Sequence, residues 1–178
     1  MAANTKKFNF ASDLAIGKPN SLGNTLKVVK AVESDPKQFS QLLKLLLHED
    51  SLVAMRAMNA TKRLMRADKD FFDPQKQALV KVYSKSKHNV VKLGLIVLYF
   101  DFIKEFSASE LKAIKSLTLK WARESQDWMI LAQGLKLLEK LAKIDPSIKP
   151  DLIKVAKVLQ RDSRKAVAMK AKKVLASL

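Results

Sequence analysis

Apolar residues recur along most of this chain at the spacing of an amphipathic helix. Val53, Ala57, Ala60 and Leu64 follow one another at intervals of four, three and four residues, so they share one face of a helix. The sequence contains neither an Asn-Gly or Asp-Gly hairpin turn nor a long alternation of apolar and polar residues. It therefore predicts an all-α protein.

The same apolar pattern returns three times at nearly constant intervals. Val53 corresponds to Val91, then to Ile130, then to Val167, at successive steps of 38, 39 and 37 residues. A regular period of this length is typical of solenoids, in which a short helical unit buries its apolar face only by stacking on its neighbours. We therefore expect an α-solenoid of about four helix–turn–helix repeats.

A second apolar segment precedes each copy, which indicates two helices per repeat. Pro36, Pro74 and Pro150 correspond at shifts of 38 and 114 and suit the first turn of a helix, while Ser107 and Glu110 have the spacing of a capping box. The repeats form a single predicted domain over 35–178, with units 35–72, 73–106, 107–145 and 146–178.

The first 34 residues differ from the repeats. We expect an N-terminal arm over 1–34 that includes a short capping helix near 24–33. Phe8, Phe10, Leu14 and Ile16 are expected to dock on the first repeat, and a flexible arm is the alternative.

The repeat pattern resembles that of HEAT-like repeat proteins. In "DSLVAMR", Asp50 and Arg56 have the Asp-to-Arg spacing of a HEAT second helix. Two other copies lack this pair: the matching positions hold Asp127 and Gln133 in one copy and His88 and Gly94 in another. The resemblance therefore concerns the architecture of 35–178. It implies a curved, right-handed stack whose second helices line the concave face.

The charge of the chain favours an anionic partner. Among 178 residues, 34 Lys and Arg exceed 17 Asp and Glu, which gives a net charge of +17. Such an excess suits nucleic acid, an acidic protein or anionic lipid. No apolar run is long enough to span a membrane. The absence of cysteine excludes disulfides and thiolate metal sites and fits a cytoplasmic location, and neither a cofactor nor a metal is expected.

Basic residues recur on the predicted second helices at positions that share one face. If these helices line a groove, the basic residues form a line along its floor and contact phosphates. The alternative is an ordinary helix face exposed to solvent. The predicted nucleic-acid-binding residues are Arg56, Arg63, Arg66, Lys136, Lys140, Lys143, Lys170 and Lys173.

A closer resemblance concerns the stretch 125–138, which looks like a repeat of the AlkD-like alkylpurine DNA glycosylases and their inactive, DNA-binding relatives. It implies non-enzymatic binding of a duplex DNA backbone, with a glycosylase as the alternative. Asp101 interrupts the basic line and is the candidate catalytic carboxylate; the simpler interpretation is an ion pair with Arg63 or Lys140. Trp121 is expected in the core and Trp128 at the surface, where stacking on a base is the functional interpretation. A scaffold for an acidic protein is the second alternative.

Overall fold

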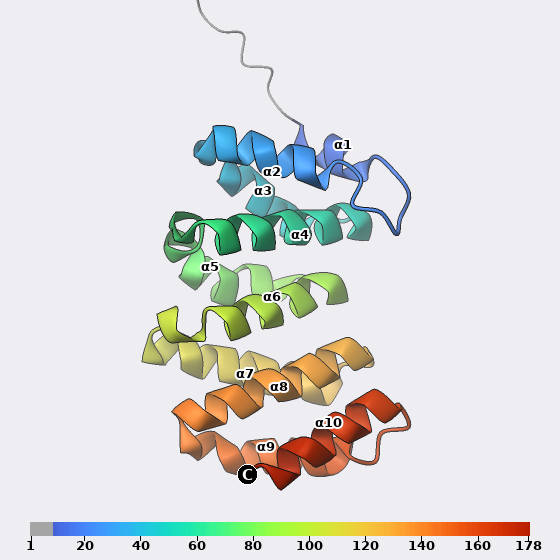
Figure 1. The fold of residues 1–178 in the computed structure, drawn as a ribbon, viewed down its shortest axis with the longest axis vertical. Coiled ribbons are helices and arrows are strands. Elements are labelled where there is room, and N and C mark those ends of the chain that lie inside the picture. The colour runs from blue at the N-terminus through green and yellow to red at the C-terminus, as the bar shows by residue number, and fades with distance from the viewer. Residues whose placement is uncertain (1–8) are drawn as a thin grey trace, which may run out of the picture. The chain divides into compact units, whose positions relative to one another are not determined.

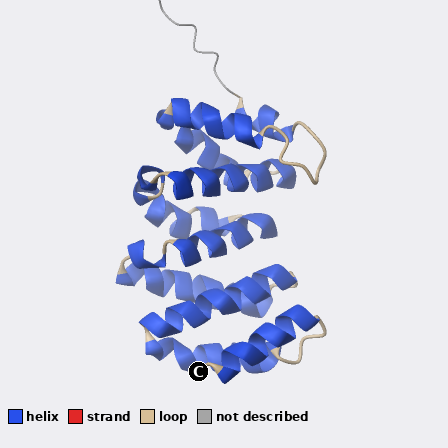
Figure 2. Cartoon of the chain, viewed as in Figure 1, coloured by secondary structure: helices blue, strands red, loops and turns tan. Residues whose placement is uncertain are grey.

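The protein is all-helical, as the sequence predicted. A computed structural model describes residues 9–178, which form ten α-helices joined by short 3-10 turns and loops, with no strand among them (Figure 2). No helix within these residues is long and apolar enough to cross a membrane. The chain divides into two compact units, Met1–Gln75 with Lys85–Val91 and Lys76–Ser84 with Lys92–Leu178.

The first unit is built around one long helix. Its α-helices are α1 (Phe10–Ala15), α2 (Thr25–Ser34), α3 (Phe39–Lys44) and α4 (Ser51–Ala67). The 3-10 turns Pro36–Gln38, Leu45–Leu47, Lys69–Phe71 and Asp73–Gln75 connect or follow them. Helix α4 packs against α1, α2 and α3, and its Ala57, Ala60 and Leu64 are fully buried (Figure 1). The apolar stripe read from the sequence is thus the core face of α4.

The second unit contains the remaining helices. They are α5 (Lys76–Lys81), most of α6 (Asn89–Asp101), α7 (Ala108–Glu124), α8 (Trp128–Ile144), α9 (Lys149–Leu159) and α10 (Lys165–Ala176). Helix α8 packs against α7, α9 and α10 (Figure 1), and Leu135, Leu137 and Leu138 are completely buried. Helices α7 and α9 also contact each other.

Polar side chains fix where the long helices begin. The capping box of Ser107 and Glu110 is present at the start of α7, as predicted. The Asp127 carboxylate caps α8 by accepting a hydrogen bond from the Met129 N–H at 2.8 Å, and Asp50 caps α4 in the same way. These caps satisfy backbone donors that have no partner within the first turn.

Pro150 lies in the first turn of a helix, as the sequence predicted. It is the second residue of α9, which begins at Lys149. A capped 3-10 turn precedes this helix, because Asp145 caps Pro146–Ile148 just as Asp35 caps Pro36–Gln38 before α3. Pro146 and Pro150 are four residues apart, about one helical turn, so both begin helical segments of the same repeat.

The N-terminal residues that the structure describes fold onto α4. Phe10 and Leu14 of α1 are buried, as expected, whereas Ile16 is exposed. Helix α2 occupies the place expected for a capping helix. The remaining predicted docking residue, Phe8, lies outside the described residues.

Candidate nucleic-acid interface

Arg56 is not part of the surface, which corrects its assignment as a phosphate contact. Its side chain is only 1% exposed. The guanidinium donates hydrogen bonds to the carbonyl oxygens of Leu14 at 2.6 Å, Ile16 at 2.8 Å, Lys18 at 2.6 Å and Ser21 at 3.2 Å. Arg56 therefore fastens the end of α1 and the loop that follows it to α4. We call this arrangement the Arg56 clasp.

The local chemistry explains the clasp. The last carbonyls of a helix lack backbone partners and carry partial negative charge, so a guanidinium with several donors suits them. Gly23 allows the close approach, because a Cβ there would lie 2.3 Å from the Ile16 oxygen and 2.8 Å from Cζ of Arg56. Its φ of +49° also favours glycine. Gly17 and Gly23, two of the four glycines, were the sequence signal for this loop.

The other two predicted arginines of α4 lie at the surface. Arg63 is exposed, and its Nε donates to Oδ1 of Asn59, one turn earlier, at 2.8 Å. Arg66 is also exposed and takes part in an interaction within the chain. Arg63 and Arg66 are thus at the surface, whereas Arg56 is not.

On α8, an aromatic ring positions two of the predicted lysines. Lys136, Lys140 and Lys143 follow at intervals of four and three residues along one face. Nζ of Lys136 lies 4.4 Å and Nζ of Lys140 lies 3.9 Å from the ring centre of Phe100. Lys140 also donates to the Phe100 carbonyl oxygen at 2.7 Å. These cation–π contacts hold both ammonium groups over one ring, but Lys140 is half-buried whereas Lys136 remains exposed.

Lys170 of α10 is engaged by a carboxylate of α8. Its Nζ lies 2.6 Å from Oε2 of Glu139, and the Ser177 hydroxyl donates to Oε1 at 3.0 Å. Burial raises the pKa of Glu139, but the hydrogen bonds from Lys170 and Ser177 and the charges of Lys170 and Lys143 outweigh it and hold that pKa below its ordinary value. Glu139 therefore stays ionised and neutralises much of the Lys170 charge.

The predicted basic set in the second unit thus divides by availability. Lys140 and Lys170 have partners within the fold. Lys136, Lys143 and Lys173 are exposed, and within the described part of the chain they form no ion pair. Because α8 and α10 pack against each other, these three ammonium groups belong to neighbouring helices of one unit. We call them the α8–α10 lysines.

Asp101, the candidate catalytic carboxylate, lies at the exposed end of α6. It takes part in an interaction within the chain. Its neighbour Tyr99 is buried, and its hydroxyl donates to the Leu79 carbonyl oxygen at 2.8 Å, so this aromatic residue belongs to the core.

The two tryptophans lie as the sequence predicted. Trp121 is buried in α7, and Trp128, the first residue of α8, is 48% exposed. Among residues 9–178, no three His, Asp or Glu side chains gather closely enough to hold a metal ion.

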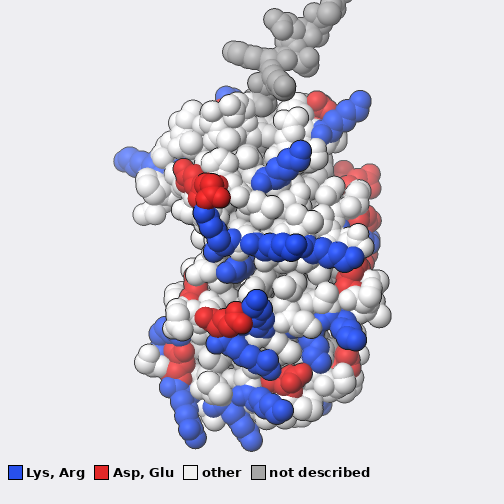
Figure 3. Space-filling view, turned by 180° about the vertical axis from the view of Figure 1, so that it is seen from behind, with Lys and Arg blue, Asp and Glu red and all other residues white. Residues whose placement is uncertain are grey.

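Basic side chains are not restricted to α8 and α10. Figure 3 shows the protein from behind, where α7 and α9 lie nearer the viewer than α8 and α10, and Lys and Arg are spread over this side with acidic groups between them. Some of these cations are paired, such as Lys115, whose Nζ is 3.5 Å from Oδ2 of Asp151. A test of the α8–α10 lysines therefore needs a control of equal charge on this second side.

Comparison of the chain with models of protein families, with curated proteins and with solved structures finds no match.

Proposed function

We propose that the protein binds the backbone of nucleic acid, with duplex DNA as the preferred ligand, through the α8–α10 lysines. The observation that carries the proposal is the accessibility of Lys136, Lys143 and Lys173 on two packed helices, with none of the three in an ion pair among the described residues. The Phe100 ring holds the ammonium group of Lys136 in place, which reduces the entropy lost when a phosphate binds. Phosphate contacts of this kind position a ligand without reading its sequence.

The proposal includes a HEAT-like stack of four helix pairs. Its support is the regular sequence period together with the pairing of long helices, such as α7 with α8 and α9 with α10. Arg63 of α4 is exposed as well and is the candidate phosphate contact of the first unit. Binding of the backbone by these cations would be tolerant of sequence.

Salt dependence tests the proposal directly. Each phosphate neutralised by a lysine lowers the slope of log affinity against log salt by about 0.9, so loss of three contacts should make the slope shallower by about 2 to 3. Fluorescence anisotropy of a labelled duplex of about 20 base pairs, titrated at about 50 and about 200 mM salt, measures this slope. The variant is Lys136→Ala, Lys143→Ala, Lys173→Ala.

A matched control removes the same charge from the other side of the second unit. Lys112, Lys120 and Lys154 are exposed on α7 and α9. The variant with all three changed to alanine should keep most of the affinity and the wild-type slope. Equal losses in both triple variants would show that net charge, rather than the α8–α10 lysines, controls binding. Absence of binding by the wild-type protein at low salt would refute the proposal altogether.

A further inference from the structure

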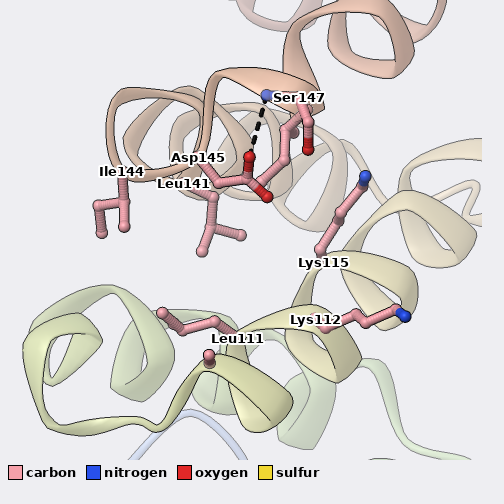
Figure 4. Close-up of a pocket in the computed structure, with 9 residues that line it drawn as sticks. Leu111, Lys112, Lys115, Leu141, Ile144, Asp145 and Ser147 are labelled. Carbon is pink, nitrogen blue, oxygen red and sulfur yellow. Dashed lines mark hydrogen bonds between the residues drawn. The ribbon is translucent and has the colours of Figure 1, made fainter.

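Two cavities lie toward opposite ends of α7, which contacts α9, and the proposed DNA binding does not use them; we call the surface that carries both cavities the valley. A cavity of about 410 Å³ lies at its first end, between the start of α7, the end of α8 and the turn that follows. Leu111, Leu141 and Ile144 face one another across it (Figure 4). Half of the Ile144 surface is exposed, so this apolar wall is open to solvent.

A second cavity, of about 340 Å³, lies at the other end of the same two helices. Ala122 of α7 and Val155, Val158 and Leu159 of α9 line it. Val158 is 71% exposed, the largest value among the large apolar side chains that the structure describes as exposed. Water therefore covers apolar surface at both ends of the valley.

Basic side chains flank both cavities. Lys112 and Lys115 lie to one side of the first cavity (Figure 4), and Arg123 and Lys154 line the second. The Asp151 carboxylate lies between a cation of each cavity. Its Oδ2 is 3.5 Å from Nζ of Lys115, which lines the first cavity, and its Oδ1 is 3.9 Å from Nη2 of Arg123, which lines the second. These long, partly exposed pairs are weak and hold the two cations along the valley.

Acidic groups compensate only part of this charge. The Asp145 carboxylate, which also lines the first cavity, accepts a hydrogen bond from the Ser147 N–H at 3.0 Å (Figure 4). The two cavities have four cationic side chains, whereas Asp145 and Asp151 supply two negative charges, so the net charge of the valley is positive. We call the two cavities and these cations the α7–α9 groove.

We infer that the α7–α9 groove binds an acidic peptide segment of a partner protein, which inserts one apolar side chain into each cavity. Leu111 and Ala122 are eleven residues apart on α7, so the cavities are separated by about 16 Å along the helix axis. An α-helical ligand spans this distance with anchors about eleven residues apart. An extended ligand needs anchors about six residues apart, because only an even spacing puts two side chains of an extended chain on one face. Carboxylates between the anchors would meet Lys112, Lys115 and Arg123.

Nucleic acid suits this groove less well than a peptide. Duplex DNA presents a continuous line of phosphates and no apolar side chain that could fill the two cavities. Binding of DNA here would leave Ile144 and Val158 facing water, whereas an anchored peptide removes their surface from it. The apolar anchors also make peptide binding less sensitive to salt than DNA binding.

The test is selection of binders from a displayed library of random peptides of about 16 residues, with wild-type protein as bait and the double variant Ile144→Ser, Val158→Ser for counter-selection. Both side chains are largely exposed, so serine should leave the helices intact, and circular dichroism checks this. The enriched peptides should carry an excess of Asp and Glu and two apolar positions at one of the two predicted spacings. A synthetic peptide of that consensus should bind the double variant about tenfold more weakly.

Three controls make the result specific. The Lys112→Ala, Lys154→Ala variant should weaken the peptide, whereas the Lys136→Ala, Lys143→Ala, Lys173→Ala variant should bind it as the wild type does. The labelled duplex should bind the Ile144→Ser, Val158→Ser variant normally, so failure of the DNA proposal and failure of this one are separate outcomes. Selection that enriches nothing over the double variant, peptides without acidic excess, or loss of duplex binding in the double variant would overturn the inference.

Discussion

Replacing Arg56 by methionine should release α1 from α4 and leave the rest of the first unit folded. Methionine keeps an unbranched apolar stem but removes every donor of the Arg56 clasp. The carbonyl oxygens of Leu14, Ile16, Lys18 and Ser21 then lose their partner. Helix α4 itself should persist, because its contacts with α2 and α3 do not depend on this guanidinium.

The size of the effect has an upper limit set by the docked segment. A buried polar group without a partner costs about 1–3 kcal/mol and a partly buried one less, so the four carbonyls would together cost up to roughly 4–12 kcal/mol if the segment stayed in place. Burial of Phe10 and Leu14 stabilises the docked helix by about 1.5–3 kcal/mol per side chain, or roughly 3–6 kcal/mol together. The segment should therefore detach, and the loss should not exceed that second value.

Hydrogen–deuterium exchange with mass spectrometry measures this release locally. Peptides that cover residues 10–23 should exchange faster by about two to four orders of magnitude, since each 1.4 kcal/mol corresponds to a factor of about ten. Peptides from α4 should change little. Arg63→Met, an exposed arginine on the same helix, is the control and should leave α1 protected. Unchanged exchange over 10–23 in Arg56→Met, or equal loss in the control, would refute this account of the clasp.

Further substitutions address the loop, the charge pair and the carboxylate of α6. Gly23→Ala places a Cβ against the Ile16 oxygen at positive φ, and thermal unfolding should show a free energy of unfolding lower by about 1–3 kcal/mol. In the control Gly134→Ala the Cβ has ordinary contacts at 3.7 and 3.9 Å, so the free energy of unfolding should rise by about 0.5–1 kcal/mol. Glu139→Gln should lower Tm at neutral pH. Because the folded-state pKa of Glu139 is lowered, the difference in Tm between wild type and variant should persist above the ordinary pKa of 4.5 and vanish as the pH falls through the folded-state pKa. A difference in Tm that is unchanged at about pH 3 would contradict this expectation. Asp101→Asn should leave duplex affinity unchanged in the anisotropy assay, and release of alkylated bases by the wild type that this variant abolishes would instead establish the glycosylase alternative.

Local chemistry was readable from the sequence because its causes lie within a few residues. The apolar stripe of α4 and the capping box of Ser107 and Glu110 depend on spacings within one or two turns. Pro150 in the first turn of α9 was readable for the same reason, because a helix accommodates proline best in that turn.

The fate of individual cations was not readable, because it depends on distant segments. Arg56 and Arg63 have the spacing of one helix face, yet a loop some 40 residues earlier in the chain buries only Arg56. Likewise Lys136 and Lys140 share a face of α8, but Lys140 is held by the carbonyl of Phe100, 40 residues away. Periodicity identifies the side of a helix; it does not identify which neighbour covers it.

The Arg56 clasp also has a consequence for protein engineering. Apart from one long contact at 3.5 Å to the Ser21 hydroxyl, its described hydrogen bonds go to main-chain oxygens. The exposed side chains of Pro19, Asn20 and Leu22 can therefore be exchanged while those acceptors remain, provided that Gly17 and Gly23 keep their positive φ. The loop 18–22 is thus a site for grafting a foreign epitope, with its two ends held by one guanidinium and two glycines.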